Sequence, residues 1–160
     1  MRVLVVSDSH GRNRYLEKAI RTEAPFDLLI HLGDLEGSQH FLEENVSCPM
    51  EMVAGNNDFL LDLEREKIIK IGKYRVLLTH GHRYQVHFGT EVLKDWARQN
   101  GADIVMFGHT HVPVIDNIGG GVIAVNPGSI SLPRQAGHEP SYIVMEIDKN
   151  KEINFTIRYL

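Results

Sequence analysis

The chain has one cysteine and one tryptophan, and it has neither a run of basic residues nor a long apolar segment. A single cysteine, Cys48, excludes a disulfide framework and any zinc or iron–sulfur site built from several cysteines. No apolar run approaches the roughly 18 residues that a membrane-spanning helix needs. The apolar run at residues 3–6 is also too short for the core of a signal peptide. We therefore expect a cytoplasmic protein with no membrane partner.

The charge balance argues against a nucleic-acid-binding surface. The sequence has 17 basic and 21 acidic residues and a formal net charge of −4, and its Lys and Arg residues are scattered. We therefore do not expect nucleic acid as a stable partner. The 160 residues, 42% of them hydrophobic and 24% charged, have the size and composition of a globular domain. We predict a single domain over residues 1–160.

The first third of the chain alternates short apolar runs with helical patterns. Brief apolar runs predict strands over residues 3–6, 28–32 and 50–54. Between them, apolar positions at helical spacing predict helices over residues 13–21 and 38–44. This βαβαβ order predicts parallel strands joined by right-handed crossovers.

The rest of the chain has more strands and one further helix. Residues 67–71 and 74–79, separated by two residues, predict an antiparallel hairpin. A helix is expected at about residues 90–99, with Val92, Leu93, Trp96 and Ala97 on its buried face. Further strands are predicted over residues 104–107, 112–115, 122–125, 142–147 and 153–159. We expect this half to be mostly antiparallel, with two sheets packed face to face and helices outside. An exposed edge strand in this half would allow a homodimer.

Five of the predicted strands end in clusters of Asp, His, Asn and Gly. In open α/β sheets, binding sites gather outside the carboxyl ends of the strands. We therefore expect these clusters to meet in space although they are far apart in the sequence. They occupy residues 7–11, 33–34, 55–58, 79–82 and 108–111.

From these clusters, two carboxylates, one amide and four imidazoles make a mixed oxygen and nitrogen donor set without a thiolate. A single ion has four to six ligands, and if one of them is water it needs fewer donors than these seven. Two divalent ions that share a carboxylate fit the number of donors better. Mixed nitrogen and oxygen donors suit transition metals more than Ca²⁺. We predict Mn²⁺ first, with Ni²⁺, Fe²⁺, Co²⁺ and Zn²⁺ as alternatives.

The remaining histidines are less promising as ligands. His40, His87 and His138 stand in polar surroundings and are predicted to be surface residues. His31 lies within a predicted strand, where we expect a hydrogen-bonded side chain in the core or behind a ligand. The segment at residues 126–129, Asn-Pro-Gly-Ser, is predicted to be a turn.

The ordered series Asp-x-His, Gly-Asp, Gly-Asn-x-Asp, Gly-His and Gly-His-x-His resembles the calcineurin-like metallophosphoesterase superfamily. With its short length, the turn at residues 126–129 and the late Pro133-Arg134, the chain is most similar to the small YfcE-type phosphodiesterase branch. The resemblance implies an α/β fold, a four-layer α-β-β-α sandwich of two mixed sheets with flanking helices, and a dinuclear metal centre. By matching motifs, one ion would be held by Asp8, His10, Asp34 and His111. The other would be held by Asp34, Asn56, His80 and His109.

The resemblance implies a metal-dependent phosphodiesterase in which a hydroxide activated by both ions attacks phosphorus. Catalytic roles would fall to Asp34, Asn56, Asn57 and Asp58. His82 and Arg134 are the candidates for contact with a small phosphodiester substrate.

One position departs from the broader family, which usually has a histidine that protonates the leaving group where this chain has Asn57. A carboxamide donates a hydrogen bond but cannot act as a general acid near neutral pH. The small phosphodiesterase branch also tends to lack this histidine, so Asn57 fits that branch and disfavours a phosphomonoesterase.

Other functions stay open. A non-catalytic protein-binding scaffold can have the same fold, as in a retromer subunit related to the family, but its ligand set looks eroded and none of the seven expected ligands is missing here. A nuclease would use the same metal centre. Sparse basic residues and the lack of an obvious aromatic stacking platform argue against it.

Overall fold

The computed structural model describes all 160 residues and contains two five-stranded sheets and three helices. The first sheet has the strand order β10-β9-β1-β2-β3. Its strands are β1 (Arg2–Val6), β2 (Leu28–His31), β3 (Met50–Met52), β9 (Ser141–Ile147) and β10 (Ile153–Tyr159). None of the helices has the length and apolar character needed to cross a membrane.

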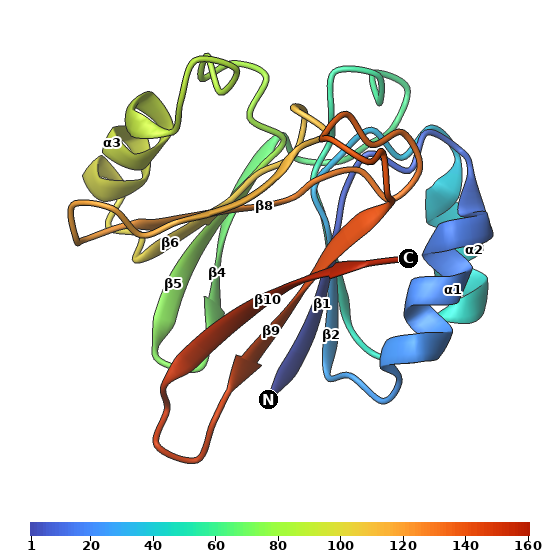
Figure 1. Cartoon of the computed structure of the whole chain (residues 1–160), viewed down its shortest axis with the longest axis horizontal. Coiled ribbons are helices and arrows are strands. Elements are labelled where there is room, and N and C mark those ends of the chain that lie inside the picture. Colours follow the sequence, from blue (N-terminus) through green and yellow to red (C-terminus); the bar gives the residue numbers. More distant parts are fainter.

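The second sheet has the strand order β4-β5-β6-β8-β7. Its strands are β4 (Glu66–Ile71), β5 (Tyr74–Thr79), β6 (Ile104–Met106), β7 (Pro113–Asp116) and β8 (Ile123–Pro127). The helices are α1 (Asn13–Glu23), α2 (Ser38–Asn45) and α3 (Glu91–Gln99). Figure 1 shows α1 and α2 on the outer face of the first sheet and α3 outside the second. The expected four-layer α-β-β-α arrangement is confirmed.

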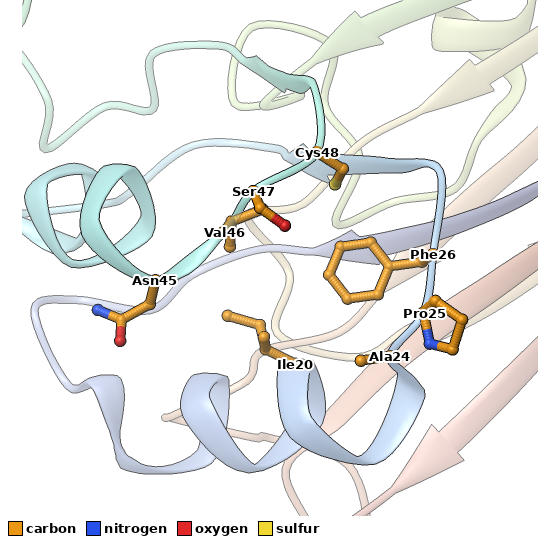
Figure 2. Close-up of a pocket in the computed structure, with 8 residues that line it drawn as sticks. All are labelled: Ile20, Ala24, Pro25, Phe26, Asn45, Val46, Ser47 and Cys48. Carbon is orange, nitrogen blue, oxygen red and sulfur yellow. The ribbon is translucent and has the colours of Figure 1, made fainter.

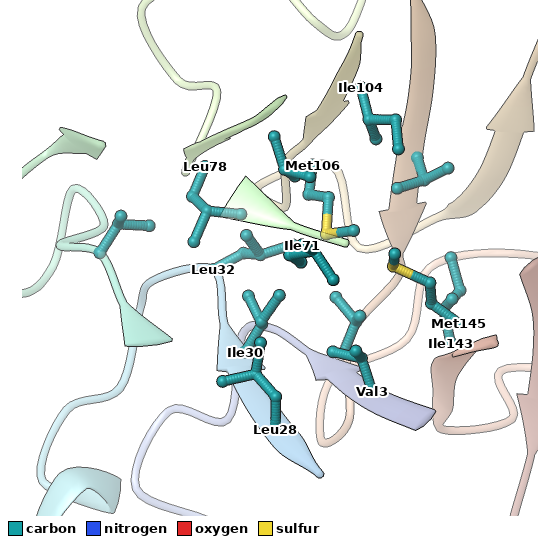
Figure 3. Packing of buried hydrophobic residues seen from close by; sticks show 14 residues of the cluster. Val3, Leu28, Ile30, Leu32, Ile71, Leu78, Ile104, Met106, Ile143 and Met145 are labelled. Carbon is teal, nitrogen blue, oxygen red and sulfur yellow. The ribbon is translucent and has the colours of Figure 1, made fainter. Parts of the chain in front are cut away.

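The side-chain alternation of the central strands creates the three cores between these layers. Val3 and Val5 of β1 point into the cluster between the two sheets, which Figure 3 shows from close by. Leu4 and Val6 point to the other face and pack against α1 and α2. Because successive side chains of a strand face opposite ways, a strand covered on both faces is apolar throughout. This explains the uninterrupted apolar run at residues 3–6.

The strand directions agree with the sequence in the first sheet and only in part in the second. The strands β1, β2 and β3 are parallel, and β4 and β5 form the expected antiparallel hairpin. The second half is mostly antiparallel, as expected, except for the pairs β5–β6 and β6–β8, which run parallel. The connection from β5 to β6 passes through α3, and such a crossover makes parallel pairing possible.

Two local expectations are corrected by the structure. In α3, Leu93 is buried as predicted, but Val92 and Trp96 are 51% and 39% exposed. Lys94 is buried instead, because its Nζ lies 2.8 Å from Oδ2 of Asp116 and this ion pair compensates the charge. Residues 126–127 belong to the end of β8, so the predicted turn begins only after them.

Candidate metal centre

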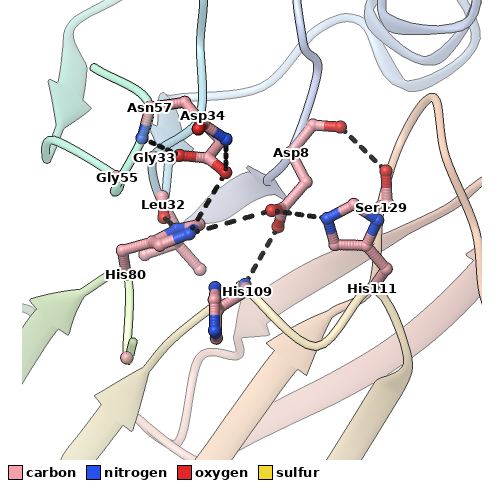
Figure 4. A network of polar contacts seen from close by, with 12 residues as sticks. Asp8, Leu32, Gly33, Asp34, Gly55, Asn57, His80, His109, His111 and Ser129 are labelled. Carbon is pink, nitrogen blue, oxygen red and sulfur yellow. Dashed lines mark hydrogen bonds and ion pairs between the residues drawn. The ribbon is translucent and has the colours of Figure 1, made fainter. Parts of the chain in front are cut away.

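Four segments that follow the ends of β1, β2, β5 and β6 bring carboxylates and imidazoles together (Figure 4). Nε2 of His111 lies 3.1 Å from Oδ1 of Asp8. Nε2 of His80 lies 3.5 Å from Oδ2 of Asp34 and 3.9 Å from Oδ1 of Asp8. The predicted convergence of the strand ends is therefore present for these four side chains, which come from both sheets.

The ligand atoms fall into overlapping groups whose members lie within 4.8 Å of one another. One group is Asp8, His10 and His111, and a second is Asp8, Asp34 and His80. Oδ2 of Asp34 lies 3.9 Å from Nε2 of His10 and 3.5 Å from Nε2 of His80. Asp34 is thus within reach of both groups, as a carboxylate shared by two ions must be.

The hydrogen bonds of two imidazoles determine which ring nitrogen carries the proton. Nδ1 of His80 lies 2.7 Å from the carbonyl oxygen of Leu32, and Nδ1 of His111 lies 2.7 Å from that of Leu132. A carbonyl oxygen only accepts, so both Nδ1 atoms must donate. In the neutral ring this leaves the Nε2 lone pair facing the carboxylates, the orientation typical of a metal ligand.

The unpaired atoms of the cluster fit a bound cation. Oδ1 of Asp8 and Nε2 of His80 are buried and have no hydrogen-bond partner. Leaving a carboxylate oxygen and a ring nitrogen buried and unpaired carries a desolvation penalty. A divalent cation would satisfy both atoms at once, and carboxylate oxygen with imidazole nitrogen is a donor set that suits transition metals.

A family model described as the calcineurin-like phosphoesterase superfamily domain matches residues 1–150. The chain belongs to this superfamily. It is 37% identical over 153 residues to the probable metallophosphoesterase YsnB of Bacillus subtilis, covering 94% of this chain and 86% of that protein. It is 28% identical over 173 residues to the phosphodiesterase YfcE of Escherichia coli K12, covering 92% of this chain and 89% of that protein.

Among solved structures, Vps29 from Entamoeba histolytica, complexed with Zn²⁺, superposes with a TM-score of 0.78 at 23% sequence identity. The match covers 99% of this chain and 99% of that chain, and it shows a shared fold. The resemblance to the calcineurin-like superfamily is thus confirmed, and the chain is a metal-dependent phosphoesterase, a hydrolase of phosphoric esters.

Charges within this phosphoesterase centre keep its carboxylates ionised. Burial alone would raise the pKa of Asp8, but the contact with His111 and the charges of His80 and His111 outweigh it and lower this pKa. The pKa of Asp34 is likewise lowered, because contact with His80 and the N–H of Asn57 outweigh burial. Burial disfavours the charged form of His80, but contact with Asp34 and the charge of Asp8 raise its pKa overall.

Five of the seven predicted ligands have a left-handed backbone. Non-glycine residues rarely adopt this conformation, and its strain persists where the surrounding contacts over-determine the backbone, most often at functional sites. The φ angles are 55° at Asp8, 48° at His10, 55° at Asp34, 68° at His109 and 60° at His111.

Two glycines allow the chain segments to approach closely enough to build the centre. A Cβ at Gly108 would lie 2.0 Å from Oγ of Ser7 and 2.7 Å from Oδ2 of Asp8. A Cβ at Gly55 would lie 2.1 Å from Oδ1 of Asp34. Any larger residue at either position would displace a ligand carboxylate or its neighbour.

Asn57, and not its neighbour, holds the carboxylate of Asp34. The main-chain N–H of Asn57 donates to Oδ1 of Asp34 at 2.9 Å, and its side-chain Nδ2 donates to Oδ2 at 2.8 Å. Asn56, predicted as a ligand, is exposed on the same turn. The role of Asn56 as a ligand stays a prediction.

The imidazole of His109 lies at the side of the ligand cluster. Its main-chain N–H donates to Oδ2 of Asp8 at 3.1 Å, and its ring centre is 5.2 Å from that of His80. It is also 4.9 Å from the ring of His87, which was predicted to be a surface residue and is exposed. Burial, then the charges of His80 and His87, lower the pKa of His109 to about 4, so it is neutral at pH 7.

Glu36 is a site residue that the sequence reasoning missed. Its Oε1 lies 2.8 Å from Nδ1 of His10, so it orients this ring as the two carbonyl oxygens orient His80 and His111. The only signal in the sequence is its position two residues after Asp34, which no pattern distinguishes from an ordinary surface glutamate.

The carboxylate of Asp58 accepts hydrogen bonds from main-chain N–H groups of two loops. It accepts hydrogen bonds from the main-chain N–H groups of Leu35 at 2.9 Å, Glu36 at 3.0 Å and Gly55 at 2.9 Å. It is buried and ties the loop after β2 to the loop after β3. The catalytic role predicted for Asp58 has no support from these contacts, which are those of a positioning residue.

The two candidates for substrate contact lie beside the cluster. The ring of His82 is 5.6 Å from that of His80 and 6.1 Å from that of His109. Burial, then the charge of His80, lower the pKa of His82. Arg134 is exposed, and its main-chain N–H donates to the carbonyl oxygen of His111 at 3.0 Å.

Side chains behind the ligands brace the strand-end loops. His31 is fully buried, and its Nε2 lies 2.9 Å from Oγ of Ser9, which confirms its expected place in the core. Nδ2 of Asn126 donates to the carbonyl oxygen of Gly108 at 2.8 Å. Oγ of Ser129 donates to the carbonyl oxygen of Asp8 at 2.8 Å. The segment after β8 therefore supports the loops that carry the ligands.

Proposed function

We propose that the chain is a phosphodiesterase that hydrolyses small phosphodiesters with two divalent ions, Mn²⁺ in the first place. The observation that carries this proposal is the pair of overlapping ligand groups, Asp8 with His10 and His111, and Asp8 with Asp34 and His80. When bound, two such ions lower the pKa of water toward neutrality and polarise phosphate oxygens. Asn56 and His109 would complete the predicted ligand set.

The chain's own residues prepare this centre to bind an anion. Asp8 and Asp34 contribute two negative charges, so two divalent ions leave the centre with a local charge of about +2. This local charge outweighs the formal net charge of −4 of the whole chain. The hydrogen bonds from Asn57 hold Asp34 in one orientation, with Oδ2 directed at the imidazoles of His10 and His80.

Small diesters are favoured over the other substrates of a phosphoesterase. Asn57 cannot supply the proton that an alkoxide leaving group needs, which disfavours a phosphomonoesterase. The scattered basic residues disfavour a nuclease.

We also propose that the enzyme acts in the cytoplasm and forms a homodimer through an edge strand such as β10.

A substrate panel tests the proposed function. Bis(4-nitrophenyl) phosphate, cyclic nucleotides and 4-nitrophenyl phosphate are assayed with Mn²⁺, Ni²⁺, Co²⁺ and Zn²⁺, with a chelator as control. We expect hydrolysis of diesters that depends on the metal and is lost in Asp8→Asn. Hydrolysis of the monoester alone would identify a phosphomonoesterase. No hydrolysis with any ion would favour the scaffold.

A further inference from the structure

A cavity of about 360 Å³ lies between the loop that precedes α3 and the segment that leads from β6 into β7. This volume falls within the range of small-molecule sites. Four apolar side chains, one imidazole and one threonine form most of its wall: Val86, Phe107, Val112, Val114, His87 and Thr110.

The cavity adjoins the metal centre through two shared elements. The ring of His87 in its wall is 4.9 Å from the ring of His109. Along residues 109–112, histidines alternate with wall residues. His111 lies in the ligand cluster and His109 beside it, whereas Thr110 and Val112 line the cavity.

The threonine hydroxyls in the wall are already satisfied by the protein, and the ring of His87 is the remaining polar side chain. Oγ1 of Thr110 accepts hydrogen bonds from Nδ2 of Asn126 at 3.0 Å and from the N–H of Val112 at 3.2 Å. The hydroxyl of Thr90 donates to Asp116. No charged side chain lines the cavity. A charged group would lose its water here with only the His87 ring as a polar replacement, whereas an aromatic ring could pack on the valines and on the ring of His87.

We propose that this cavity binds an aromatic ester group of the substrate while the phosphate lies at the metal centre. The inference rests on the proposed function and narrows its substrate class to phosphodiesters with at least one aromatic substituent. The valines and Phe107 would remove that substituent from water, and His87 would contact its face.

A second cavity has the same volume of about 360 Å³ but lies away from the metal centre (Figure 2). It lies between the ends of α1 and α2, beside Ala24, Pro25 and Phe26, which precede β2. The metal centre follows the other ends of the strands, so no substrate held there could reach this second cavity.

The test is binding of phosphonates to the Mn²⁺-loaded protein, measured by titration calorimetry. Methylphosphonate, phenylphosphonate and benzylphosphonate present the same anionic group and differ in the substituent. We expect phenylphosphonate or benzylphosphonate to bind at least about tenfold more tightly than methylphosphonate, because the ring leaves water. Equal affinities of all three would overturn the proposal.

Substitutions in the cavity wall test whether the aromatic phosphonates bind there. Val112→Asp places a charge in the cavity wall and is expected to abolish the preference for the aromatic compounds, while binding of methylphosphonate reports that the centre is intact. Val112→Thr, similar in shape, is expected to weaken the preference severalfold and serves if Val112→Asp does not fold. Val92→Asp, on the exposed face of α3, is the matched control and should retain the preference. An undiminished preference in both Val112 variants would place the aromatic group elsewhere.

Binding and hydrolysis separate the two proposals. An aromatic preference without hydrolysis of any ester would leave the cavity assigned and remove the proposed function. Hydrolysis of diesters without an aromatic preference in phosphonate binding would support the proposed function and overturn the assignment of the cavity.

Discussion

At the scale of single residues, three imidazoles of the centre are oriented by oxygen atoms that pair with their Nδ1 atoms. The Nδ1 atoms of His80 and His111 donate to main-chain carbonyl oxygens, whereas that of His10 faces the carboxylate of Glu36. A carboxylate partner increases the basicity of the ring it orients. His10 is therefore the imidazole whose donor strength depends on a side chain that can be changed by mutation.

Removing a ligand charge should cost far more than removing a neighbouring ring. Asp34→Asn is expected to lower Mn²⁺ affinity by well over about 100-fold, because Asp34 gives its charge to the group with Asp8 and His80 and lies 3.9 Å from His10 of the other group. His82→Ala, at 5.6 Å from the His80 ring, is expected to cost at most about tenfold. Metal content after dialysis and turnover of a diester measure both effects. Equal losses in the two variants would show that the assignment of Asp34 is wrong.

The absence of an acid at position 57 predicts a dependence on the leaving group. Asn57 donates both of its hydrogen bonds to Asp34 and has no proton to transfer. Aryl diesters with acidic phenols should therefore be hydrolysed much faster than alkyl diesters. The slope of log kcat against leaving-group pKa measures this, and a flat plot would contradict it. Asn57→His should make the slope shallower, because an imidazole can donate a proton.

Burial of His31 predicts a loss of stability in acid. Burial lowers its pKa to about 4, whereas an unfolded histidine has a pKa of about 6.5. Above pH 6.5 both states are neutral and the effect vanishes. As the pH falls from 6.5 toward 4 the unfolded state takes up the proton first, so the free energy of unfolding decreases, by about 2 kcal/mol between pH 7.5 and 5.

Urea unfolding in the presence of chelator measures the His31 effect. In His31→Gln, which has no titrating ring, the decrease between pH 7.5 and 5 should be smaller by that amount. The same decrease in both proteins would mean that His31 does not carry this part of the acid sensitivity.

At the scale of elements, the loops after the strands are held more firmly than loops usually are. Asp58 connects the loop after β2 with the loop after β3 through three main-chain N–H groups. Asn126, at the end of β8, holds the loop after β6 through the carbonyl oxygen of Gly108 and Oγ1 of Thr110. These contacts fix the left-handed backbone of the ligand residues, which is strained when unsupported.

Replacing Asp58 by asparagine tests this bracing. Asp58→Asn keeps the size but removes the charge and one acceptor oxygen, so at least one buried N–H loses its partner. We expect a loss of about 2–3 kcal/mol in the free energy of unfolding. The matched control is Asp62→Asn, at an exposed position of the following loop. If the two variants were equally stable in urea, the bracing role of Asp58 would be refuted.

At the scale of the whole molecule, the metal centre joins the two sheets at one edge. Asp8 and Asp34 follow strands of the first sheet, and His80 and His111 follow strands of the second. Away from this edge, a cluster of buried apolar side chains fills the space between the sheets. A cation bound to ligands from both sheets therefore stabilises their packing as well as the local loops.

Metal loading should consequently raise the melting temperature. A ligand present at 100 times its Kd stabilises the folded state by about 2.7 kcal/mol, which corresponds to roughly 5–10 °C for a domain of this size. Thermal melts in Mn²⁺ and in chelator measure the shift, and Asp34→Asn should show a much smaller one. A melting temperature indifferent to Mn²⁺ would mean that the donors do not bind the ion tightly.

Local pattern was enough to predict most elements and the convergence of polar residues at one edge of the sheets. Apolar runs and helical spacing are properties of neighbouring residues, so the strands and helices were predicted to within a few residues. The five polar clusters at strand ends marked the edge at which Asp8, Asp34, His80 and His111 meet. Their order along the chain also identified the family.

Contacts between distant segments were decided only by folding. The pairing of Glu36 with His10, the packing of His87 on His109 and the commitment of Asp58 to backbone N–H groups join loops that no periodicity relates. The parallel course of β5, β6 and β8 likewise depends on how α3 packs against the second sheet. Such contacts depend on loop dihedral angles and on burial, which the identity of neighbouring residues does not specify.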